Sequence, residues 1–301
     1  MNNNSPTVTV VIPTYNQADY LREALRSVIN QSFTNWCAIV VNNFSTDHTK
    51  QVIDEINDAR ITIVDFRNEG IIAASRNIGI QRATSTYVAF LDSDDWWMPT
   101  KLDRCVSELA KGCDLVCHSE EWRSANSSRI VHYGPASRAD YRALLLGGNC
   151  LSTSAVIGRT DMFQRMGGFS TAPEFVTAED YELWLRLARE NFRFSFVAEV
   201  LGAFRIHSAS ASSSIQRNSD AEQAVVAHHS ATAPFITPRI RRRRLALSHY
   251  GAARSYQRTG DHQNAWRALS QAFRASPFRV RLYAALLVSL GNTFRSKSRA
   301  R

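Results

Sequence analysis

The sequence predicts an α/β fold: a Rossmann-like, mostly parallel sheet flanked by helices, with a C-terminal α-helical appendage. Segments rich in β-branched residues alternate with segments of helical periodicity over residues 7–91, which is typical of a parallel sheet. Polar clusters stand where three of these strands end, at the edge where such sheets bind ligands. Acidic residues almost disappear after residue 238. We therefore expect an α/β domain over residues 1–215, a linker over 216–238 and a basic helical tail over 239–301.

The elements of the first half follow from periodicity and capping. A continuous run of β-branched residues indicates a strand buried on both faces, and apolar residues three or four positions apart indicate a helix. Asp47 is a typical N-cap residue for the second helix. We expect strands at 7–12, 37–41, 61–64 and 87–91, alternating with helices at 16–29, 47–56 and 71–83.

The second half has a mixed pattern. Apolar, β-branched segments there indicate extended chain, and periodic segments indicate helices. The polar segment 208–219 is typical of a flexible loop, and the chain beyond it is helical and basic. We expect extended segments at 151–157 and 194–206, and helices at 159–166 and 179–189.

The bulk composition suits a globular protein, since 44% of the 301 residues are apolar. The opening MNNNSPT leads straight into an apolar strand, so we expect no signal peptide. Apolar runs are too short for a spanning helix, which needs about 18 residues or more. The five cysteines are odd in number and lack metal-ligand spacing, which indicates reduced thiols in a cytoplasmic protein.

Three aspartates, Asp92, Asp94 and Asp95, follow the fourth strand within the stretch FLDSDDWWMP. Such charges repel one another unless a cation or a cluster of donors lies among them. Mg²⁺ and Mn²⁺ prefer oxygen ligands and often take one or two carboxylates together with substrate phosphates. The alternative is a solvated acidic turn that caps the helix beginning near Pro99. We expect Asp95 to act only as this cap.

A series of motifs resembles those of family 2 glycosyltransferases, which have a GT-A fold. The acidic turn resembles the Asp-x-Asp metal motif of the family. The resemblance covers roughly residues 7–215, and several motifs in the right order are far more specific than one Asp-x-Asp. The other motifs are the opening strand and nucleotide-binding turn at 10–16, the helix at 74–79, a Gly-Gly-Phe element at 166–169, a Glu-Asp element at 179–186 and an Arg-x-His element at 205–208.

The resemblance implies a donor site for a nucleotide-diphosphate sugar. Thr14 and Tyr15 would line the base pocket, and Arg76 would approach the diphosphate or the ribose. For Arg76 the alternative is a surface salt bridge, and for His207 it is a structural role. By resemblance, the nucleotide-sugar-binding residues are Pro13, Thr14, Tyr15, Asn42, Arg76, Asp92 and Ser93, and the ligands of a divalent Mn²⁺ or Mg²⁺ ion are Asp94, Asp92 and His207.

An inverting transfer also needs a base for the acceptor hydroxyl. By resemblance to the Glu-Asp motif we expect Asp180 in this role, with Glu179 as the alternative. Adjacent helix residues diverge by about 100°, so one of the two acids points into the cleft. The other interpretation is that both acids only favour the N-terminus of a helix electrostatically.

One departure from the family pattern affects base recognition. The second strand usually ends in Asp-Asp-Gly-Ser, but here it ends in Asn42-Asn43-Phe44-Ser45. The family's first aspartate typically accepts a hydrogen bond from uracil N3–H. Asn42 can accept through its carbonyl oxygen, but only as a neutral partner, and it can also donate. We expect UDP in the donor, with dTDP and GDP left open.

The basic tail differs in charge from the rest of the chain. Residues 1–238 hold 21 Lys or Arg and 26 Asp or Glu, whereas residues 239–301 hold 15 Lys or Arg and one acid, Asp261. Residues 252–277 resemble one tetratricopeptide-type helix pair, or form an ordinary helical hairpin. Residues 278–290 interleave arginines with apolar residues, which favours a helix on an anionic membrane surface over a core helix. No nucleic-acid recognition motif accompanies the charge.

Together with the residues that fit it, the resemblance implies an inverting, metal-dependent glycosyltransferase. Its partners would be a nucleotide-sugar donor and a glycan or lipid-linked acceptor, in bacterial surface polysaccharide or lipopolysaccharide synthesis. We expect it in the cytoplasm, with peripheral contact to the inner face of the cytoplasmic membrane through 239–301. One rival is a catalytically inactive nucleotide-sugar-binding scaffold that acts through its helical tail. Another, a sugar nucleotidyltransferase, would need a glycine-rich phosphate loop after the first strand, and residues 13–17 are not one.

Overall fold

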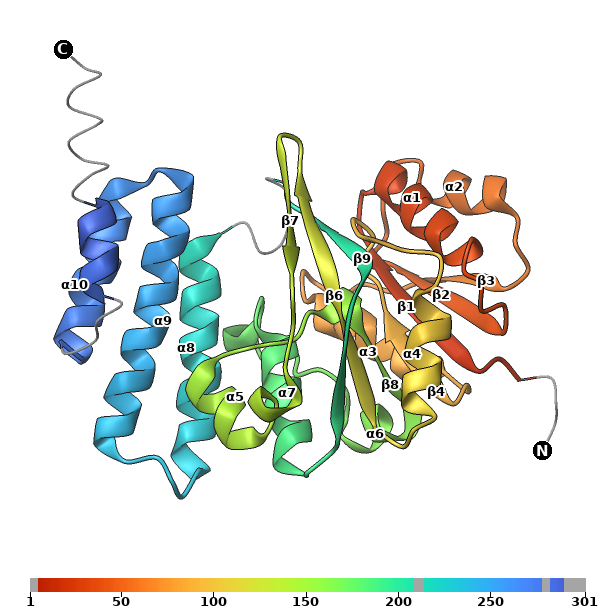
Figure 1. Cartoon of the computed structure of the whole chain (residues 1–301). Helices are drawn as coiled ribbons and strands as arrows, with labels where there is room; N and C mark the ends of the chain where they lie inside the picture. Colours follow the sequence, from red (N-terminus) through yellow and green to blue (C-terminus); the bar gives the residue numbers. More distant parts are fainter. Residues whose placement is uncertain (1–4, 208–213, 278–281, 290–301) are drawn as a thin grey trace, which may run out of the picture. The chain divides into compact units, whose positions relative to one another are not determined.

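The computed structural model describes residues 5–207, 214–277 and 282–289 (Figure 1). The chain divides into two compact units: an α/β unit of Met1–Leu144 with Gly148–Ser210, and a helical unit of Leu145–Gly147 with Ala211–Arg301. The segment 216–238, expected as a linker, is mostly helical, because helix α8 spans Ile215–Thr232. Residues 208–213 of the expected flexible loop lie outside the described residues.

One mixed sheet organises the α/β unit. Within the described residues its order is β3-β2-β1-β4-β8-β6-β9-β5, and β7 pairs with β6. The four strands expected from the sequence are β3, β2, β1 and β4, and their parallel pairing is confirmed. The strands are β1 (Val8–Thr14), β2 (Trp36–Asn42), β3 (Ile61–Asp65), β4 (Tyr87–Phe90), β5 (Trp96–Trp97), β6 (Leu115–Ser124), β7 (Ser127–Val131), β8 (Val156–Arg159) and β9 (Phe194–Arg205).

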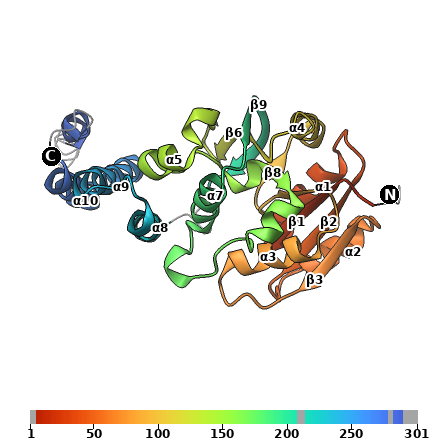
Figure 2. The same ribbon diagram turned by 90° about the horizontal axis from the view of Figure 1, so that it is seen from below.

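Helices cover both faces of the sheet, as Figure 2 shows from below. On one face, Val10 and Ile12 of β1 share a core with Leu25 of α1 and Leu102 of α4. On the other face α3 lies so close to β1 that a Cβ on Gly79 would be 2.3 Å from Val11 Cγ1. The helices of this unit are α1 (Ala18–Ile29), α2 (Thr49–Ile56), α3 (Ile72–Arg82), α4 (Lys101–Leu109), α6 (Thr160–Arg165) and α7 (Glu179–Arg189), while α5 (Tyr141–Gly147) begins in this unit and ends in the helical unit.

Three local expectations differ from the structure. The segment 151–157, expected to be extended, contains a 3-10 turn at Thr153–Ala155, and β8 starts only at Val156. Asp95 does not cap α4, so that prediction was wrong: the N-cap position is Thr100, because β5 separates the acidic turn from the helix. The predicted N-cap of α2 is displaced by one residue: the N-cap position is His48, and Asp47, just before it, accepts hydrogen bonds from the N–H and hydroxyl of Thr49.

The helical unit consists of α8, α9 (Pro238–Thr259) and α10 (His262–Ala275), with a further helical segment at 282–289. Gly260 ends α9 in the left-handed conformation with φ of 78°, which suits glycine because it has no Cβ. The positions expected to form a helix pair make its core: Ala253, Tyr256, Ala265, Leu269 and Ala272 are buried. Among the described residues, no helix has the length and apolar character to cross a membrane.

Candidate active site

The polar rim of the sheet forms where the parallel strands end. Thr14 and Asn42 are register partners at the ends of β1 and β2, and both are buried. Pro13 is also buried within β1, whereas Tyr15, the next residue after Thr14, is 55% exposed. Of the residues expected in the base pocket, Tyr15 is therefore the one whose side chain is accessible to a ligand.

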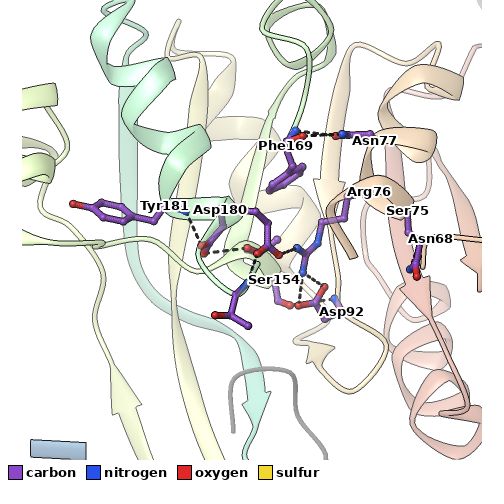
Figure 3. A network of polar contacts seen from close by, with 12 residues as sticks. Asn68, Ser75, Arg76, Asn77, Asp92, Ser154, Phe169, Asp180 and Tyr181 are labelled. Atoms are coloured by element: carbon purple, nitrogen blue, oxygen red, sulfur yellow. Dashed lines mark hydrogen bonds and ion pairs between the residues drawn. The ribbon is translucent and has the colours of Figure 1, made fainter. Parts of the chain in front are cut away.

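Arg76, from α3, is the centre of a buried ion-pair network (Figure 3). Its Nη2 donates to both oxygens of Asp92 at 2.7 and 2.9 Å, and its Nη1 donates to Glu179 Oε1 at 2.8 Å. The Arg76 side chain is only 5% exposed, so the alternative of a surface salt bridge is wrong. Burial lowers the pKa of Arg76, but the charges of Asp92 and Glu179 outweigh burial and raise it. Arg76 thus stays charged and joins the acidic turn after β4 to the start of α7.

The two aspartates of the Asp-x-Asp turn have different partners. Asp92 pairs with Arg76, whereas Asp94 Oδ2 lies 2.9 Å from His207 Nε2. Burial and the nearby charge of Asp92 raise the pKa of Asp94. The His207 ring also lies against Tyr20 of α1, with ring centroids 5.2 Å apart. The structure therefore brings Asp94 and His207 together, while Asp92 is paired with Arg76.

This donor set fits a divalent cation only in part. Among the described residues, no three His, Cys, Asp or Glu side chains are close enough to form a metal cage. Asp94 and His207 offer one carboxylate and one imidazole, and a hard cation that binds substrate phosphates needs few protein ligands. The raised pKa of Asp94 marks a carboxylate whose charge a cation would stabilise. Asp94 and His207 are thus the two neighbouring side chains here that could hold a divalent cation.

Asp95 has a structural place that sequence reasoning missed. Its Oδ2 accepts from the Ser154 hydroxyl at 2.6 Å, and its Oδ1 accepts from the Arg205 N–H at 2.9 Å. Burial, together with the charge of Asp94, raises the pKa of Asp95 well above its ordinary value. Ser93 is also buried and donates to Gln17 Oε1 at 2.5 Å. The acidic turn is therefore fixed from several sides.

The two acids that start α7 are clearly distinguished by their contacts. Glu179 is buried and pairs with Arg76, while its other oxygen accepts from the Thr177 N–H at 2.8 Å. Asp180 Oδ2 has only long contacts, to Asn149 Nδ2 at 3.3 Å and Thr153 Oγ1 at 3.4 Å. Burial and the charge of Glu179 raise the pKa of Asp180 to about 6. Asp180 Oδ1 accepts from the Tyr181 N–H at 2.6 Å, so Oδ2 is the less constrained oxygen of this carboxylate.

The 3-10 turn at Thr153–Ala155 connects the acidic turn to Asp180. Ser154 Oγ accepts from the Asp92 N–H at 3.1 Å while its hydrogen goes to Asp95, and the preceding Thr153 contacts Asp180. Neither residue was expected in the site, because the segment has the apolar, β-branched composition of a strand. Two adjacent small polar residues form no periodic or motif pattern, so the sequence did not indicate that Thr153 and Ser154 belong to the site.

A second connection joins α3 to the Gly-Gly-Phe element. Asn77 Nδ2 donates to the Phe169 carbonyl, and Asn77 Oδ1 accepts from the Phe169 N–H, both at 2.8 Å. The Phe169 ring lies 5.3 Å from the Arg76 guanidinium carbon. Asn77 follows Arg76 directly in the helix motif at 74–79. Its position in that motif could have indicated that it belongs to the site.

Asn42 is placed differently from the expected base-binding role. It is fully buried, its Oδ1 accepts from the Ser45 N–H at 3.0 Å, and its Nδ2 donates to Asp65 Oδ1 at 2.7 Å. Asp65 ends β3 and is the register partner of Asn42. The amide of Asn42 therefore holds its neighbours at the rim.

Comparison with known proteins agrees with this architecture. Residues 9–167 match the model of the family described as Glycosyl transferase family 2. The chain is 29% identical over 217 residues to TuaG of Bacillus subtilis, a glycosyltransferase named for teichuronic acid biosynthesis, covering 71% of this chain and 84% of that protein. It is 30% identical over 186 residues to the UDP-Glc:α-D-GlcNAc-diphosphoundecaprenol β-1,3-glucosyltransferase WfgD of Escherichia coli, covering 61% of this chain and 70% of that protein.

Solved structures show the same fold. S. aureus TarS in complex with UDP-GlcNAc superposes with a TM-score of 0.64 and 21% identity, covering 95% of this chain and 89% of that chain. The mannosyltransferase PcManGT of Pyrobaculum calidifontis, in complex with GDP-Man and Mn²⁺, superposes with a TM-score of 0.62 and 20% identity, covering 96% of this chain and 81% of that chain. The predicted GT-A fold with C-terminal helices is therefore confirmed, and the chain belongs to glycosyl transferase family 2.

Proposed function

We propose that this glycosyltransferase is an inverting, metal-dependent enzyme that transfers a sugar from a UDP-sugar to a hydroxyl of a glycan or lipid-linked acceptor. The names of its relatives support this proposal, since TuaG is named for teichuronic acid synthesis and WfgD for transfer from UDP-Glc to a diphosphoundecaprenol-linked sugar. The same names favour bacterial surface polysaccharide or lipopolysaccharide synthesis as the context. PcManGT, crystallised with Mn²⁺, supports the metal.

The observation that carries the proposal is the Arg76 network. Asp92, at the donor-side turn, and Glu179, beside the proposed base, share one buried guanidinium. Positioning of the donor and activation of the acceptor would thus both depend on the Arg76 ion-pair network. An in-line displacement needs its nucleophile and leaving group aligned closely, because misplacement by about 1 Å can cost about a hundredfold in rate.

On the donor side, the chain would position a diphosphate leaving group. Asp94 and His207 would hold a divalent cation, which neutralises the charge that grows on the leaving diphosphate. Asp92, oriented by Arg76, would contact the ribose, and the exposed ring of Tyr15 would lie against the base. Ser93, which bonds to Gln17, would support the turn from within.

On the acceptor side, Asp180 would accept the proton of the attacking hydroxyl. The long contacts of its Oδ2 leave lone pairs available on that oxygen, and a pKa of about 6 keeps Asp180 mostly ionised at neutral pH while still basic enough to take a proton. Attack from the face opposite the diphosphate inverts the configuration at C1. Glu179 is engaged by Arg76 and the Thr177 N–H, which disfavours it as the base.

The tail would bring the enzyme to its lipid-linked acceptor as a peripheral protein on the cytoplasmic face of the membrane. Exposed arginines gather at the start of α9, and the helical segment 282–289 exposes Tyr283, Leu287 and Val288. Basic residues near an anionic surface contribute about 1 kcal/mol each, and apolar side chains add burial in the interface. The expected arginines at 279 and 281 lie outside the described residues.

The direct test is transfer from UDP-sugars with Mn²⁺ to a panel of diphosphate-lipid-linked sugars, with the product anomer assigned by NMR. A product whose anomeric configuration is opposite to that of the donor is expected. A retained configuration would contradict the inverting proposal. Donor binding without turnover on any acceptor would instead favour the scaffold that has lost catalysis.

A further inference from the structure

Two large aromatic side chains lie open at the rim next to the ends of buried strands. Tyr15 follows β1 and is 55% exposed, and Phe44 follows β2 and is 48% exposed. The two turns are held together, because the Asn43 N–H donates to the Thr14 carbonyl at 3.0 Å. Exposed rings at the ends of two neighbouring parallel strands offer flat apolar surface where α/β sheets bind ligands.

Phe44 occupies an unfavourable backbone conformation. Its φ is 54°, in the left-handed region that costs a residue with a side chain about 1–2 kcal/mol. The Arg67 guanidinium carbon lies 5.2 Å from the ring centroid. The ring leaves about half of its surface exposed in spite of this backbone cost, so the strain points to a ligand-binding role for Phe44.

A carboxylate completes the edge of this surface. Asp65 ends β3, one strand beyond Asn42, and therefore about 5 Å further along the sheet. Its Oδ1 accepts from Asn42 Nδ2 and its Oδ2 accepts from Lys50 Nζ, both at 2.7 Å. Since Asn42 Oδ1 already accepts from the Ser45 N–H, Asn42 orients Asp65, and Asp65 carries the negative charge at this edge.

Resting on the proposed function, we infer that Asp65, and not residue 42, reads the base of the donor, and that this base is uracil stacked on Phe44. Uracil presents one N–H between two carbonyl oxygens. The Asp65 carboxylate accepts from that N–H in a charge-assisted hydrogen bond, and Lys50 donates to a flanking carbonyl. Cytosine has a lone pair at the same ring nitrogen, which repels a carboxylate, so Asp65 selects uracil over cytosine.

Calorimetry of UDP, CDP and GDP with Mn²⁺ tests this assignment on the full chain. Wild type is expected to bind UDP at least about tenfold more tightly than CDP. Asp65→Asn keeps an oxygen for Asn42, so its melting temperature is expected to match wild type. Its UDP affinity is expected to fall about tenfold or more, with CDP changed far less. Asp54→Asn, on the exposed side of the adjacent helix α2, makes the same charge change and is the matched control.

A second variant tests the stacking role separately. Phe44→Gly relieves the left-handed backbone and is expected to raise the melting temperature. It is also expected to weaken UDP and CDP by the same factor, about five- to thirtyfold, because stacking does not depend on the base edge. Unchanged affinity in Phe44→Gly overturns the stacking assignment.

The outcomes separate the inference from the proposed function. Wild-type UDP binding with an unchanged UDP-to-CDP ratio in Asp65→Asn overturns the inference and leaves the proposed function intact. Tighter binding of GDP than UDP by wild type overturns the choice of uracil. A folded wild-type chain that binds none of the three nucleotides contradicts the proposed function, and the inference falls with it.

Discussion

At the residue scale, burial changes the pKa of acidic side chains, and Glu120 is an example. Glu120 of β6 is buried and accepts from the Tyr133 hydroxyl at 2.8 Å and from the Ser152 hydroxyl at 3.2 Å. Burial raises the pKa of Glu120 to about 7, in spite of these hydrogen bonds. Glu120, beside the turn that carries Thr153, therefore prefers its protonated form in the folded chain below about pH 7.

This preference predicts how stability depends on pH. A carboxyl whose pKa is raised on folding stabilises the native state below its unfolded pKa of 4.5, and this stability is lost as pH rises to about 7. Glu120→Gln cannot ionise, so it is expected to be more stable than wild type at pH 8 by on the order of 2 kcal/mol, and similar at pH 5. Urea unfolding at both pH values measures the difference.

The control for this measurement is Glu174→Gln, because Glu174 is an exposed acid of the same unit. It is expected to change stability little, and equally, at both pH values. Equal effects of Glu120→Gln at pH 5 and pH 8 would show that Glu120 is ionised in the folded chain and would contradict the raised pKa.

At the element scale, close packing of α3 on β1 fixes the position of Arg76. A Cβ on Gly79 would lie 2.3, 2.6 and 2.9 Å from three atoms of Val11. Gly79→Ala is therefore expected to lower the free energy of unfolding by about 1–3 kcal/mol, measured by urea unfolding. Adding Val11→Ala removes the two nearest of these atoms, Cγ1 and Cγ2, and leaves only the Cβ at 2.9 Å. A cycle of the two variants is therefore expected to show a favourable coupling.

A matched substitution separates packing from helix propensity. Gly251 in α9 has no atom within 4 Å of an added Cβ, so Gly251→Ala is expected to stabilise its helix by about 1 kcal/mol. A Gly79→Ala variant as stable as wild type would mean that α3 can move away from β1 at no cost.

The parallel strands and the helices between them could be predicted from the sequence because their signals are local. β-Branched runs and helical periodicity depend on neighbouring residues, and β1 to β4 follow them. The partners of Arg76 could not be predicted in the same way. Glu179 lies 103 positions away from Arg76, and Asp95 is held by Ser154 at a separation of 59. Such pairings depend on how the elements pack, which periodicity does not encode.

At the scale of the whole molecule, the two units differ in net charge. The tail from residue 239 holds 15 Lys or Arg against Asp261 alone. The segment expected as a linker forms α8, and apolar residues of this helix, including Ala221 and Val225, are buried. The helix was not predicted because the segment has a mostly polar composition. The first turns of α9 are basic, and the side chains of Arg239, Arg241 and neighbouring arginines are exposed.

The charged tail predicts binding to anionic vesicles. Full-length protein is expected to sediment with phosphatidylglycerol vesicles at low salt and to be released as salt screens the attraction. Reversing Arg241, Arg242 and Arg243 to glutamate is expected to abolish sedimentation, while the same reversal at exposed Lys111, Arg159 and Arg193 in the α/β unit leaves it. Equal sedimentation of the two triple variants would contradict a role for α9.

The central claim is that Asp180 accepts the proton of the acceptor hydroxyl, and the pH dependence of kcat/KM for transfer tests it most directly. Wild type is expected to lose activity about tenfold per pH unit below about 6, because protonated Asp180 cannot act as a base. Asp180→Asn is expected to be about 10²- to 10⁴-fold slower and to lack that acidic limb, with Glu174→Gln unchanged. An Asp180→Asn variant with wild-type rate and the same acidic limb would contradict the account.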